Sequence, residues 1–216
     1  MRGRLVRLAR PTDEDYGLLE SWMSSSAPVA PLTGDLGSDP TAADLKQANQ
    51  GNQRFYMVRL LADDTPVGTV NYQREGPGWC SLGGAIGDPE LWQKGYAADA
   101  FMVLIDYLFH TGNARKVTAT AFTFNKRSMQ MLSRAGFVCE GILREHCYLD
   151  GQWHDAVLWS MLRAEFYEQA RKDAERSERL AVQDLVPAAD KAQARRVLAE
   201  HLRSARTSIG DFLDRS

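Results

Sequence analysis

A turn between Asp88 and Ala98 contains the residue types of this 216-residue chain that best suit ligand binding. It includes Gly95 and the small residues Ala97 and Ala98, which leave backbone N–H groups open. If the turn opens a helix, these groups and the positive end of the helix dipole can bind phosphate. In the structural alternative, Gly95 only permits a tight turn and the alanines favour the helix. Taken alone, the segment favours this second interpretation.

Other common catalytic and nucleotide-binding motifs are missing. The chain has no GxGxxG, GxxxxGK[ST], GxSxG or HExxH segment, which excludes the usual dinucleotide, P-loop, hydrolase and zinc-peptidase sites. Cys80, Cys139 and Cys147 are odd in number and form no CxxC pair, so we interpret them as reduced core or strand residues. His146 and His154 are too weak a signal for metal ligands, and we expect no metal.

The composition is that of an ordinary folded protein, with 44% apolar and 25% charged residues. Lys and Arg number 26 against 28 Asp and Glu, and a net charge of -2 gives nucleic acid no general attraction. Residues 1–10 lack the apolar region of a secretory signal, and the apolar stretch 96–109 is interrupted by Asp99 and Asp106 and too short for a bilayer. We therefore expect a cytoplasmic protein with no membrane or nucleic-acid partner.

The N-terminal half alternates between strand and helix patterns. Alternation over Arg4–Leu8 predicts a strand, and Thr12–Asp15 supplies a capping box for the helix that follows. The Ser-, Pro- and Gly-rich stretch 24–40 predicts a loop, of a length that often forms a lid, before a short helix over Thr41–Gln50. Strand-like runs follow at Phe55–Leu61, Val67–Arg74 and Trp79–Ile86.

Two glycines, Gly83 and Gly84, lie inside the third of these runs and predict a bulge or a close backbone approach. Beyond Asp88-Pro89 an apolar stripe predicts a helix that ends near Gly112. The remaining elements are a strand over Lys116–Phe122, a helix over Asn125–Ala135, and strands over Phe137–Leu143, His146–Leu149 and His154–Met161. This order predicts a mixed α/β sheet of the α+β kind, not repeating βαβ units.

The chain from Arg163 onward has a helical pattern only, with a break at Val186-Pro187. Apolar residues between Ala194 and Leu213 recur at three-four spacing and form one stripe. We expect this stripe to bury against the core or against a second subunit, and a homodimer through these helices is one arrangement that would bury it.

Two blocks of sequence resemble the GNAT superfamily of acyl-CoA N-acyltransferases, in its RimJ/RimL-like branch. Trp92-Gln-Lys-Gly-Tyr-Ala-Ala-Asp-Ala100 is similar to the W-x-K-G-Y-A-T-E-A turn of that branch. The second block follows the branch in order and spacing through Asn125-x-x-Ser128, Gly136-Phe137, Glu140-Gly141, Leu143-Arg144-Glu145, Gly151 and Asp155. The resemblance implies a GNAT-type acyltransferase fold over residues 1–162, with 163–216 as an amphipathic helical C-terminal extension.

The same resemblance implies acetyl-CoA as the co-substrate. Backbone groups near Ile86 and Gly87, on a splayed strand, would pair with the pantetheine arm as an added strand does. Asn125 resembles a helix-start asparagine that contacts the cofactor, although a plain N-cap explains the residue equally well. The pyrophosphate would be held by the amides of Lys94, Gly95, Tyr96, Ala97 and Ala98.

Two residues depart from the wider superfamily. Trp92 stands where many members have Gln or Arg, so one phosphate contact is missing. Leu132 stands where many have a tyrosine general acid, which leaves the proton donor to the CoA thiolate open between Ser128 and a water. Ser128 is otherwise an ordinary polar helix residue.

The implied chemistry needs a base, because an amine attacks only when neutral and its pKa lies well above neutrality. Glu140 and His146, on the late strands, are the candidates. Their structural alternatives are a salt-bridge partner for Glu140 and a surface residue for His146, and Glu145 and Asp155 are interpreted as structural. A backbone N–H of the splayed strand can stabilise the oxyanion of the tetrahedral intermediate.

The sequence therefore predicts an acetyl-CoA-dependent N-acetyltransferase acting on a primary amine, either a protein N-terminus or a cationic small molecule. Asp35, Asp39 and Asp44, in or beside the loop, would suit a cation or are simply solvated. The small residues at Gly83–Ala85 would also leave room for a longer acyl group. The rival hypothesis, favoured by Leu132, is a catalytically silent acyl-CoA-binding protein that acts through its C-terminal helices.

Overall fold

The computed structural model describes residues 1–33, 39–175 and 185–204. The chain divides into two compact units, Met1–Gln169 and Ala170–Ser216. The first unit contains the sheet and every residue that the sequence assigned to cofactor binding or catalysis. Among the described helices, none combines the length and apolar composition needed to cross a membrane.

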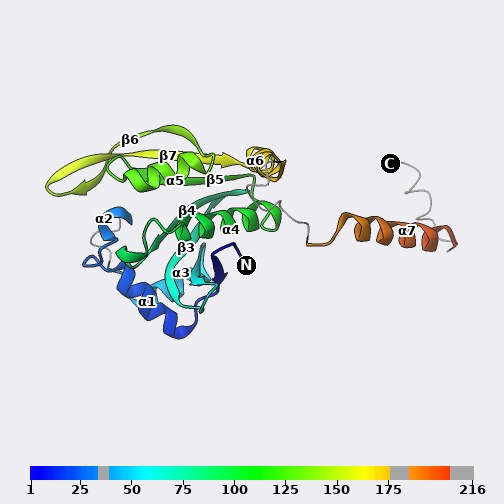
Figure 1. Ribbon diagram of the computed structural model, residues 1–216, viewed down its shortest axis with the longest axis horizontal. Coiled ribbons are helices and arrows are strands. Elements are labelled where there is room, and N and C mark those ends of the chain that lie inside the picture. Colours follow the sequence, from blue (N-terminus) through cyan, green and yellow to red (C-terminus); the bar gives the residue numbers. More distant parts are fainter. Residues whose placement is uncertain (34–38, 176–184, 205–216) are drawn as a thin grey trace. The chain divides into compact units, whose positions relative to one another are not determined.

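The first unit is built on seven strands: β1 (Val6–Ala9), β2 (Gln53–Leu60), β3 (Pro66–Gly76), β4 (Trp79–Ile86), β5 (Lys116–Phe122), β6 (Val138–Leu149) and β7 (Gln152–Leu162). They form one sheet in the order β1-β2-β3-β4-β5-β7-β6 (Figure 1). Neighbours are antiparallel except β4 and β5, which run parallel. The mixed sheet predicted from the sequence is confirmed.

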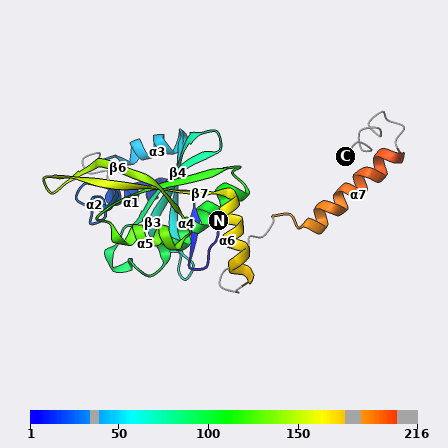
Figure 2. The same cartoon turned by 90° about the horizontal axis from the view of Figure 1, so that it is seen from above.

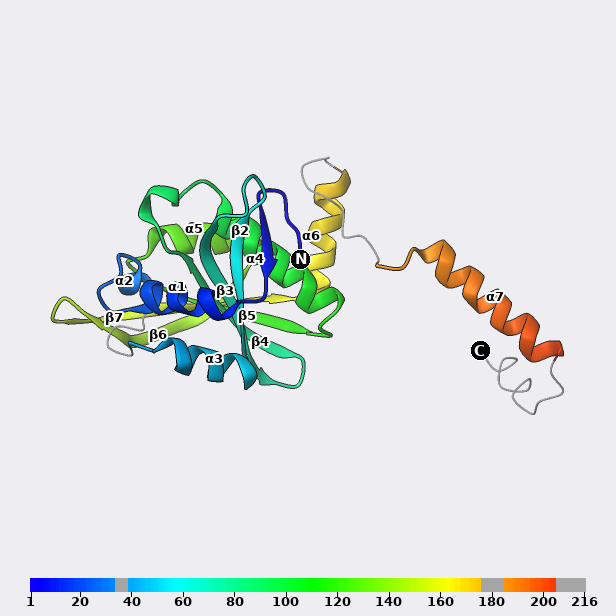
Figure 3. The same ribbon diagram turned by 90° about the horizontal axis from the view of Figure 1, so that it is seen from below.

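The helices of this unit are α1 (Asp13–Met23), α2 (Ala30–Thr33), α3 (Ala42–Gln50), the short 3-10 turn η1 (Pro89–Leu91), α4 (Tyr96–His110), α5 (Lys126–Arg134) and the start of α6 (Arg163–Glu175). Phe55 of β2 packs in one cluster with Leu19 of α1 and Leu45 of α3. Tyr56, the next residue, meets Tyr107 of α4 edge-on. Because neighbouring strand residues point to opposite faces, α1 and α3 cover one face of this half of the sheet and α4 covers the other (Figure 3).

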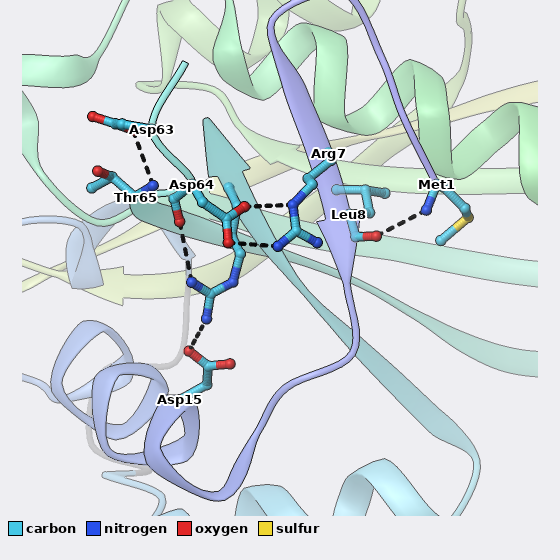
Figure 4. Close-up of polar contacts among 8 residues, drawn as sticks. Met1, Arg7, Leu8, Asp15, Asp63, Asp64 and Thr65 are labelled. Carbon is cyan, nitrogen blue, oxygen red and sulfur yellow. Dashed lines mark hydrogen bonds and ion pairs between the residues drawn. The ribbon is translucent and has the colours of Figure 1, made fainter. Parts of the chain in front are cut away.

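Ion pairs fasten β1 and α1 to the rest of the sheet (Figure 4). Arg7 of β1 pairs with Asp64 in the β2–β3 turn. Arg59 of β2 pairs with Asp15 of α1 at 2.6 Å, and Asp15 also closes the predicted capping box with Thr12. Burial by itself would raise the pKa of Asp15. The hydrogen bonds from Thr12 and Arg59 outweigh burial and lower this pKa below its usual value. The N-terminal strand and helix are thereby held at the sheet edge.

Two glycine-containing segments have conformations that favour glycine, one at the predicted close approach in β4 and one at a hairpin turn. Pairing of β3 with β4 is continuous across Gly83 and Gly84, so these glycines mark a close approach and not a bulge. Gly84 has a φ of 151°, and a Cβ there would lie 2.5 Å from the carbonyl oxygen of Thr69. At the β6–β7 turn Asp150 and Gly151 have φ angles of 52° and 79°, as a two-residue Asp-Gly hairpin turn requires.

The prediction of two separate strands over 137–143 and 146–149 was wrong, because both belong to β6. This strand and β7 form a long hairpin (Figure 2). Their register shifts between Leu143 and Cys147, and pairing with β7 then resumes. Glu145, inside this bulge, has a φ of 49°, and its N–H donates to the carboxylate of Asp155 at 2.8 Å. Such a bulge bends a strand and redirects its side chains.

The start of α6 packs on the first unit. Phe166 is only 4% exposed, and its ring centre lies 5.4 Å from that of Phe109 in α4. The Tyr167 hydroxyl lies 3.0 Å from Nδ1 of His110. The first helix after β7 is therefore partly a component of the sheet-containing unit.

The second unit contains α7 (Ala188–Ser204), which follows the predicted break at Val186-Pro187. Val197 and Leu198, on its predicted apolar stripe, are 60% and 53% exposed. The rest of the stripe, through Leu213, continues into residues 205–216, outside the described part of the chain. Burial of the stripe, on a second subunit or elsewhere, stays a prediction.

Candidate active site

The strands β4 and β5 pair over their first halves and then separate. Trp79–Leu82 pairs with Lys116–Ala119, and beyond these residues each strand keeps only its outer neighbour. The pairing of β4 with β3 extends to Ile86, and that of β5 with β7 extends to Phe122. Because β4 and β5 are parallel, Ile86 and Phe122 end on the same, open side. We call the space between these strand ends the β4–β5 gap.

Backbone groups of β4 face this gap. The N–H of Gly87 donates to the carbonyl of Val67 in β3 at 3.0 Å. Since alternate residues of a strand direct their N–H and C=O groups to opposite edges, Ile86 and Gly84 direct theirs to the gap. The Ile86 carbonyl accepts a hydrogen bond from the Trp92 indole at 2.7 Å. The N–H of Gly87, expected near pantetheine, is instead engaged with β3.

The segment that the sequence predicted to bind phosphate leads from β4 into α4, and we call it the phosphate turn. Gln93 and Gly95 have left-handed φ angles of 65° and 86°. Gly95 is the N-cap of α4 and offers no side-chain oxygen to the first-turn N–H groups, which have no partner within the helix. The five residues assigned to the pyrophosphate are all exposed or half-buried: Lys94, Gly95, Tyr96, Ala97 and Ala98.

The N-terminal segment fixes the first turn of α4 through Asp99. Its carboxylate accepts hydrogen bonds from the N–H groups of Arg4 at 3.1 Å, Leu5 at 2.7 Å and Val6 at 3.0 Å. A Cβ at Gly3 would lie 2.4 Å from the same carboxylate, so the backbone passes directly over it. A carboxylate that would repel phosphate at this helix end is thereby bonded to the backbone of the N-terminal segment.

Asn125 and Ser128 lie at the start of α5, which follows β5 on the open side of the gap. Asn125 is 6% exposed, and its side-chain oxygen accepts a hydrogen bond from the Ser128 N–H at 3.1 Å. Asn125 is therefore the N-cap of α5, as the structural interpretation of this residue predicts. Ser128 is half-buried, and Leu132, one helical turn further, belongs to the core.

Glu140 lies at the closed end of the β4–β5 pair. Its carboxylate oxygens are 2.6 Å and 2.8 Å from the ammonium group of Lys116, and it accepts a hydrogen bond from Ser160 at 2.7 Å. Lys116 pairs with Trp79, at the end of the paired region opposite to the gap. The hydrogen bond from Lys116 lowers the pKa of Glu140, which makes it a weaker base. The geometry favours the salt-bridge alternative for this residue.

The bulge of β6 lies beside a shallow hollow of about 760 Å³ at the open side. His146 lines the hollow, and its ring centre is 6.4 Å from that of Phe122, the last residue of β5. The Asp155 carbonyl accepts hydrogen bonds from the N–H and hydroxyl of Thr123, both at 3.0 Å. Of the two candidate bases, His146 is thus the one that lies near the open end of β5. Glu145 and Asp155, which sequence reasoning set aside, line the same hollow.

The acidic residues expected to attract a cation are bonded locally. Asp39 accepts a hydrogen bond from the Ser25 hydroxyl at 2.9 Å, and Asp44 accepts one from the Thr41 hydroxyl at 2.6 Å. Hydrogen bonds from Ser25 and from Thr41 lower the pKa of Asp39 and Asp44 respectively. Asp35 lies outside the described residues.

Residues 5–138 match the family model described as an acetyltransferase (GNAT) domain, which is more than half of the chain. The chain belongs to the GNAT acetyltransferase family. The resemblance found in the sequence is confirmed.

GNAT relatives of known sequence include the [ribosomal protein uS5]-alanine N-acetyltransferase of Escherichia coli, 37% identical over 122 residues. That match covers 54% of this chain and 62% of the relative, so the chain spans less than two thirds of it. The uncharacterized N-acetyltransferase p20 of Bacillus licheniformis is 30% identical over 57% of this chain and 68% of its own length. These relatives agree with the RimJ/RimL-like branch.

Solved GNAT structures show the same fold. A spermidine N-acetyltransferase SpeG chimera from Vibrio cholerae and human SSAT superposes with a TM-score of 0.66 and 18% identity, over 76% of this chain and 98% of that one. A ribosomal-protein-S5-alanine acetyltransferase from Vibrio fischeri superposes with a TM-score of 0.62 and 21% identity, over 77% of this chain and 97% of that one. RimL in complex with coenzyme A superposes with a TM-score of 0.63 and 15% identity, over 73% of this chain and 94% of that one.

The residues that depart from the wider GNAT pattern have structural roles here, Trp92 as a hydrogen-bond donor to β4 and Leu132 in the core. Cys80 and Cys147 are buried, which raises the pKa of both thiols, whereas Cys139 is exposed. Within residues that the structure describes, His, Cys, Asp and Glu side chains form no group that could hold a metal ion.

Proposed function

We propose that this GNAT protein is an acetyl-CoA-dependent N-acetyltransferase that acts on a primary amine. The observation that carries the proposal is the β4–β5 gap, which has an unpaired strand edge on one side and the uncapped start of α4 at its open end. The strand edge suits an extended amide-containing arm, and the helix start suits a pyrophosphate. Acetyl-CoA contains both groups on one molecule.

The residues of the chain divide between holding the cofactor and moving protons. The backbone of Gly84 and Ile86 faces the gap, where an N–H can bind the pantetheine arm or the oxyanion of the tetrahedral intermediate. N–H groups from Lys94 to Ala98 would bind the pyrophosphate. Acetyl-CoA brings the acyl thioester to this site.

The transfer itself needs one base and one acid. The amine nitrogen forms a bond to the thioester carbonyl carbon, the C–S bond breaks, and the thiolate takes a proton from Ser128 or a water. The surplus proton of the amine passes to a base, directly or through water. His146 is our first candidate for that base because it lines the hollow beside the end of β5. Glu145 lines the same hollow and is the second.

The acceptor is either a protein N-terminus or a cationic small molecule. Both classes occur among the proteins to which this chain is similar, named for the alanine of ribosomal protein uS5 and for spermidine. Two carboxylates, Glu145 and Asp155, and one guanidinium, Arg144, line the hollow, and this excess of acidic groups would favour a cationic amine of either class.

Calorimetry with acetyl-CoA and CoA-release assays over peptides, polyamines and aminoglycosides test the proposal. We expect heat of binding with acetyl-CoA and CoA release with at least one amine. Glu145→Gln and His146→Gln separate the candidate bases, since loss of the true base lowers kcat by about 10²-fold or more while the other variant stays near wild type. Absence of both binding and turnover in the wild-type protein would sink the proposal.

The second candidate function is an acyl-CoA-binding protein without catalysis, which acts through its C-terminal helices. The observation that favours it is Leu132, buried in the core where many members have a tyrosine acid. Binding of acetyl-CoA without CoA release across the whole amine panel would support this alternative.

A further inference from the structure

Arg127 of α5 is held over an aromatic ring at the phosphate turn. Its guanidinium carbon lies 4.9 Å from the ring centre of Trp92. Trp92 is itself fixed by the hydrogen bond from its indole to the Ile86 carbonyl at 2.7 Å. It precedes Gly95, the N-cap of α4, by three residues. The stack therefore joins the start of α5 to the phosphate turn at the open end of the gap.

The helix dipole disfavours a cation at the position of Arg127. Lys126 and Arg127 occupy the first turn of α5, which contains no acidic residue, and cations are disfavoured at the positive end of a helix. Both side chains are exposed. Among the residues that the structure describes, no carboxylate forms an ion pair with Arg127. An anion bound beside this turn would offset the repulsion between these cations and the helix end.

We propose that Arg127, on its Trp92 platform, binds a phosphate group of the acyl-CoA. The inference rests on the proposed function and names a side chain for it. Because Trp92 stands where many members have Gln or Arg, one phosphate contact is missing at this position. Arg127 of α5 then supplies that phosphate contact. A guanidinium suits the role because its planar fork can stack on an indole face and still donate two parallel hydrogen bonds to phosphate oxygens.

The test compares the affinity of the full chain for CoA in wild type, Arg127→Gln and the matched control Lys126→Gln, by calorimetry. We expect Arg127→Gln to weaken CoA binding about tenfold, the usual effect of one charge-assisted hydrogen-bond pair, and Lys126→Gln to change it less than about threefold. 3'-Dephospho-CoA identifies the phosphate. If the loss disappears with this ligand, Arg127 binds the 3'-phosphate, and if the loss persists, Arg127 binds the diphosphate.

Two further measurements separate phosphate binding from a structural role of the stack. Pantetheine, which carries no phosphate, should bind wild type and Arg127→Gln equally. The melting temperature of unliganded Arg127→Gln should stay near that of wild type, because the lost cation–π contact and the relieved helix-end repulsion are similar in size.

The inference is overturned if Arg127→Gln binds CoA as tightly as wild type, or if it weakens pantetheine as much as CoA. Either result leaves the proposed function standing, provided that wild type binds acetyl-CoA. Failure of the wild-type protein to bind CoA would instead remove the proposed function itself.

Discussion

Gly84 controls the spacing of β3 and β4 beside the gap through the absence of a side chain. Its φ of 151° is one that L side chains rarely adopt, and a Cβ would lie 2.5 Å from the Thr69 carbonyl oxygen and 2.8 Å from the Val70 Cα. Neither backbone atom can move without shifting β3. The glycine pair predicted a bulge or a close backbone approach, because strand interiors otherwise disfavour glycine, and the structure has the close approach.

Substitution of Gly84 by Ala should therefore destabilise the protein by about 2–4 kcal/mol, through backbone strain and overpacking. Thermal or urea unfolding measures the change. Gly17→Ala in α1 is the control, because a Cβ there meets nothing within 4 Å, and it should be neutral or raise stability by up to about 1 kcal/mol. Equal melting temperatures for the two variants would show that β4 tolerates a side chain at Gly84.

Glu140 should contribute to stability in a pH-dependent way and contribute little to catalysis. Its pKa in the folded protein is lowered by Lys116 and Ser160. The stabilisation is therefore full above the unfolded-state pKa and is lost as the pH falls through the lower folded-state value. Glu140→Gln should melt below wild type near neutral pH, and the difference should vanish in acid.

The same variant tests the role of Glu140 in the reaction. We expect kcat of Glu140→Gln within about threefold of wild type, since loss of a general base costs at least about 10²-fold. Glu90→Gln, an exposed change in η1, is the control for the melting curves. A large loss of kcat with an unchanged melting curve would restore Glu140 as the base.

Most features of the helix starts near the site depend on residues that are close together in the sequence, so local patterns can predict them. The capping boxes of α1 and α3, the N-cap Asn125 and the left-handed Gly95 are all set by residues within a few positions of each other. The bulge of β6 was missed because Glu145, a residue without special turn propensity, takes a positive φ only through its bond to Asp155, ten positions away. The pairing of Glu140 with Lys116 spans 24 positions and is equally invisible to local pattern.

The joint between the N-terminal segment and α4 depends on Asp99. Asp99→Asn keeps the shape but replaces one acceptor oxygen by an NH₂ group, which faces backbone donors. We expect a loss of about 1–3 kcal/mol in stability and a higher KM for acetyl-CoA, because the first turn of α4 is no longer fixed. Asp13→Asn, which breaks the exposed pair with Lys46, should cost less than about 1 kcal/mol and leave KM unchanged.

If the KM for acetyl-CoA stays the same in Asp99→Asn while its stability falls, the joint holds the fold but does not position the phosphate turn.

The sheet-containing unit and the unit with α7 differ in how much of each can be predicted from the sequence. The first has a family and a mixed sheet that the sequence predicted, whereas its cofactor-binding and catalytic residues stay predictions. Periodicity also predicted α7, but an apolar stripe does not reveal its partner, since burial on the core and burial on a second copy need the same spacing. The predicted division of the chain into 1–162 and 163–216 assigns α6 to the extension, whereas its start packs on Phe109.

Burial of the stripe on a second copy, one of the two expected arrangements, predicts that α7 mediates self-association. Replacement of Val197 and Leu198 by Lys should lower the mass of the assembly in light scattering, because an apolar contact is lost and charge is introduced. Arg195→Lys with Arg196→Lys, on the same helix, should leave the mass unchanged. A wild-type protein that is already monomeric would remove this role for α7.

We propose that acetyl-CoA bound at the β4–β5 gap transfers its acetyl group to an amine. The most direct test of this claim is mass spectrometry of amines incubated with the protein and acetyl-CoA, for wild type and for Ala98→Glu, which places a carboxylate at the exposed start of α4. We predict that an alanine-initiated peptide or a polyamine gains one acetyl group with wild type, and that the variant folds but forms far less product. Binding of acetyl-CoA without any acetylated amine, or equal product from Ala98→Glu, would contradict the claim.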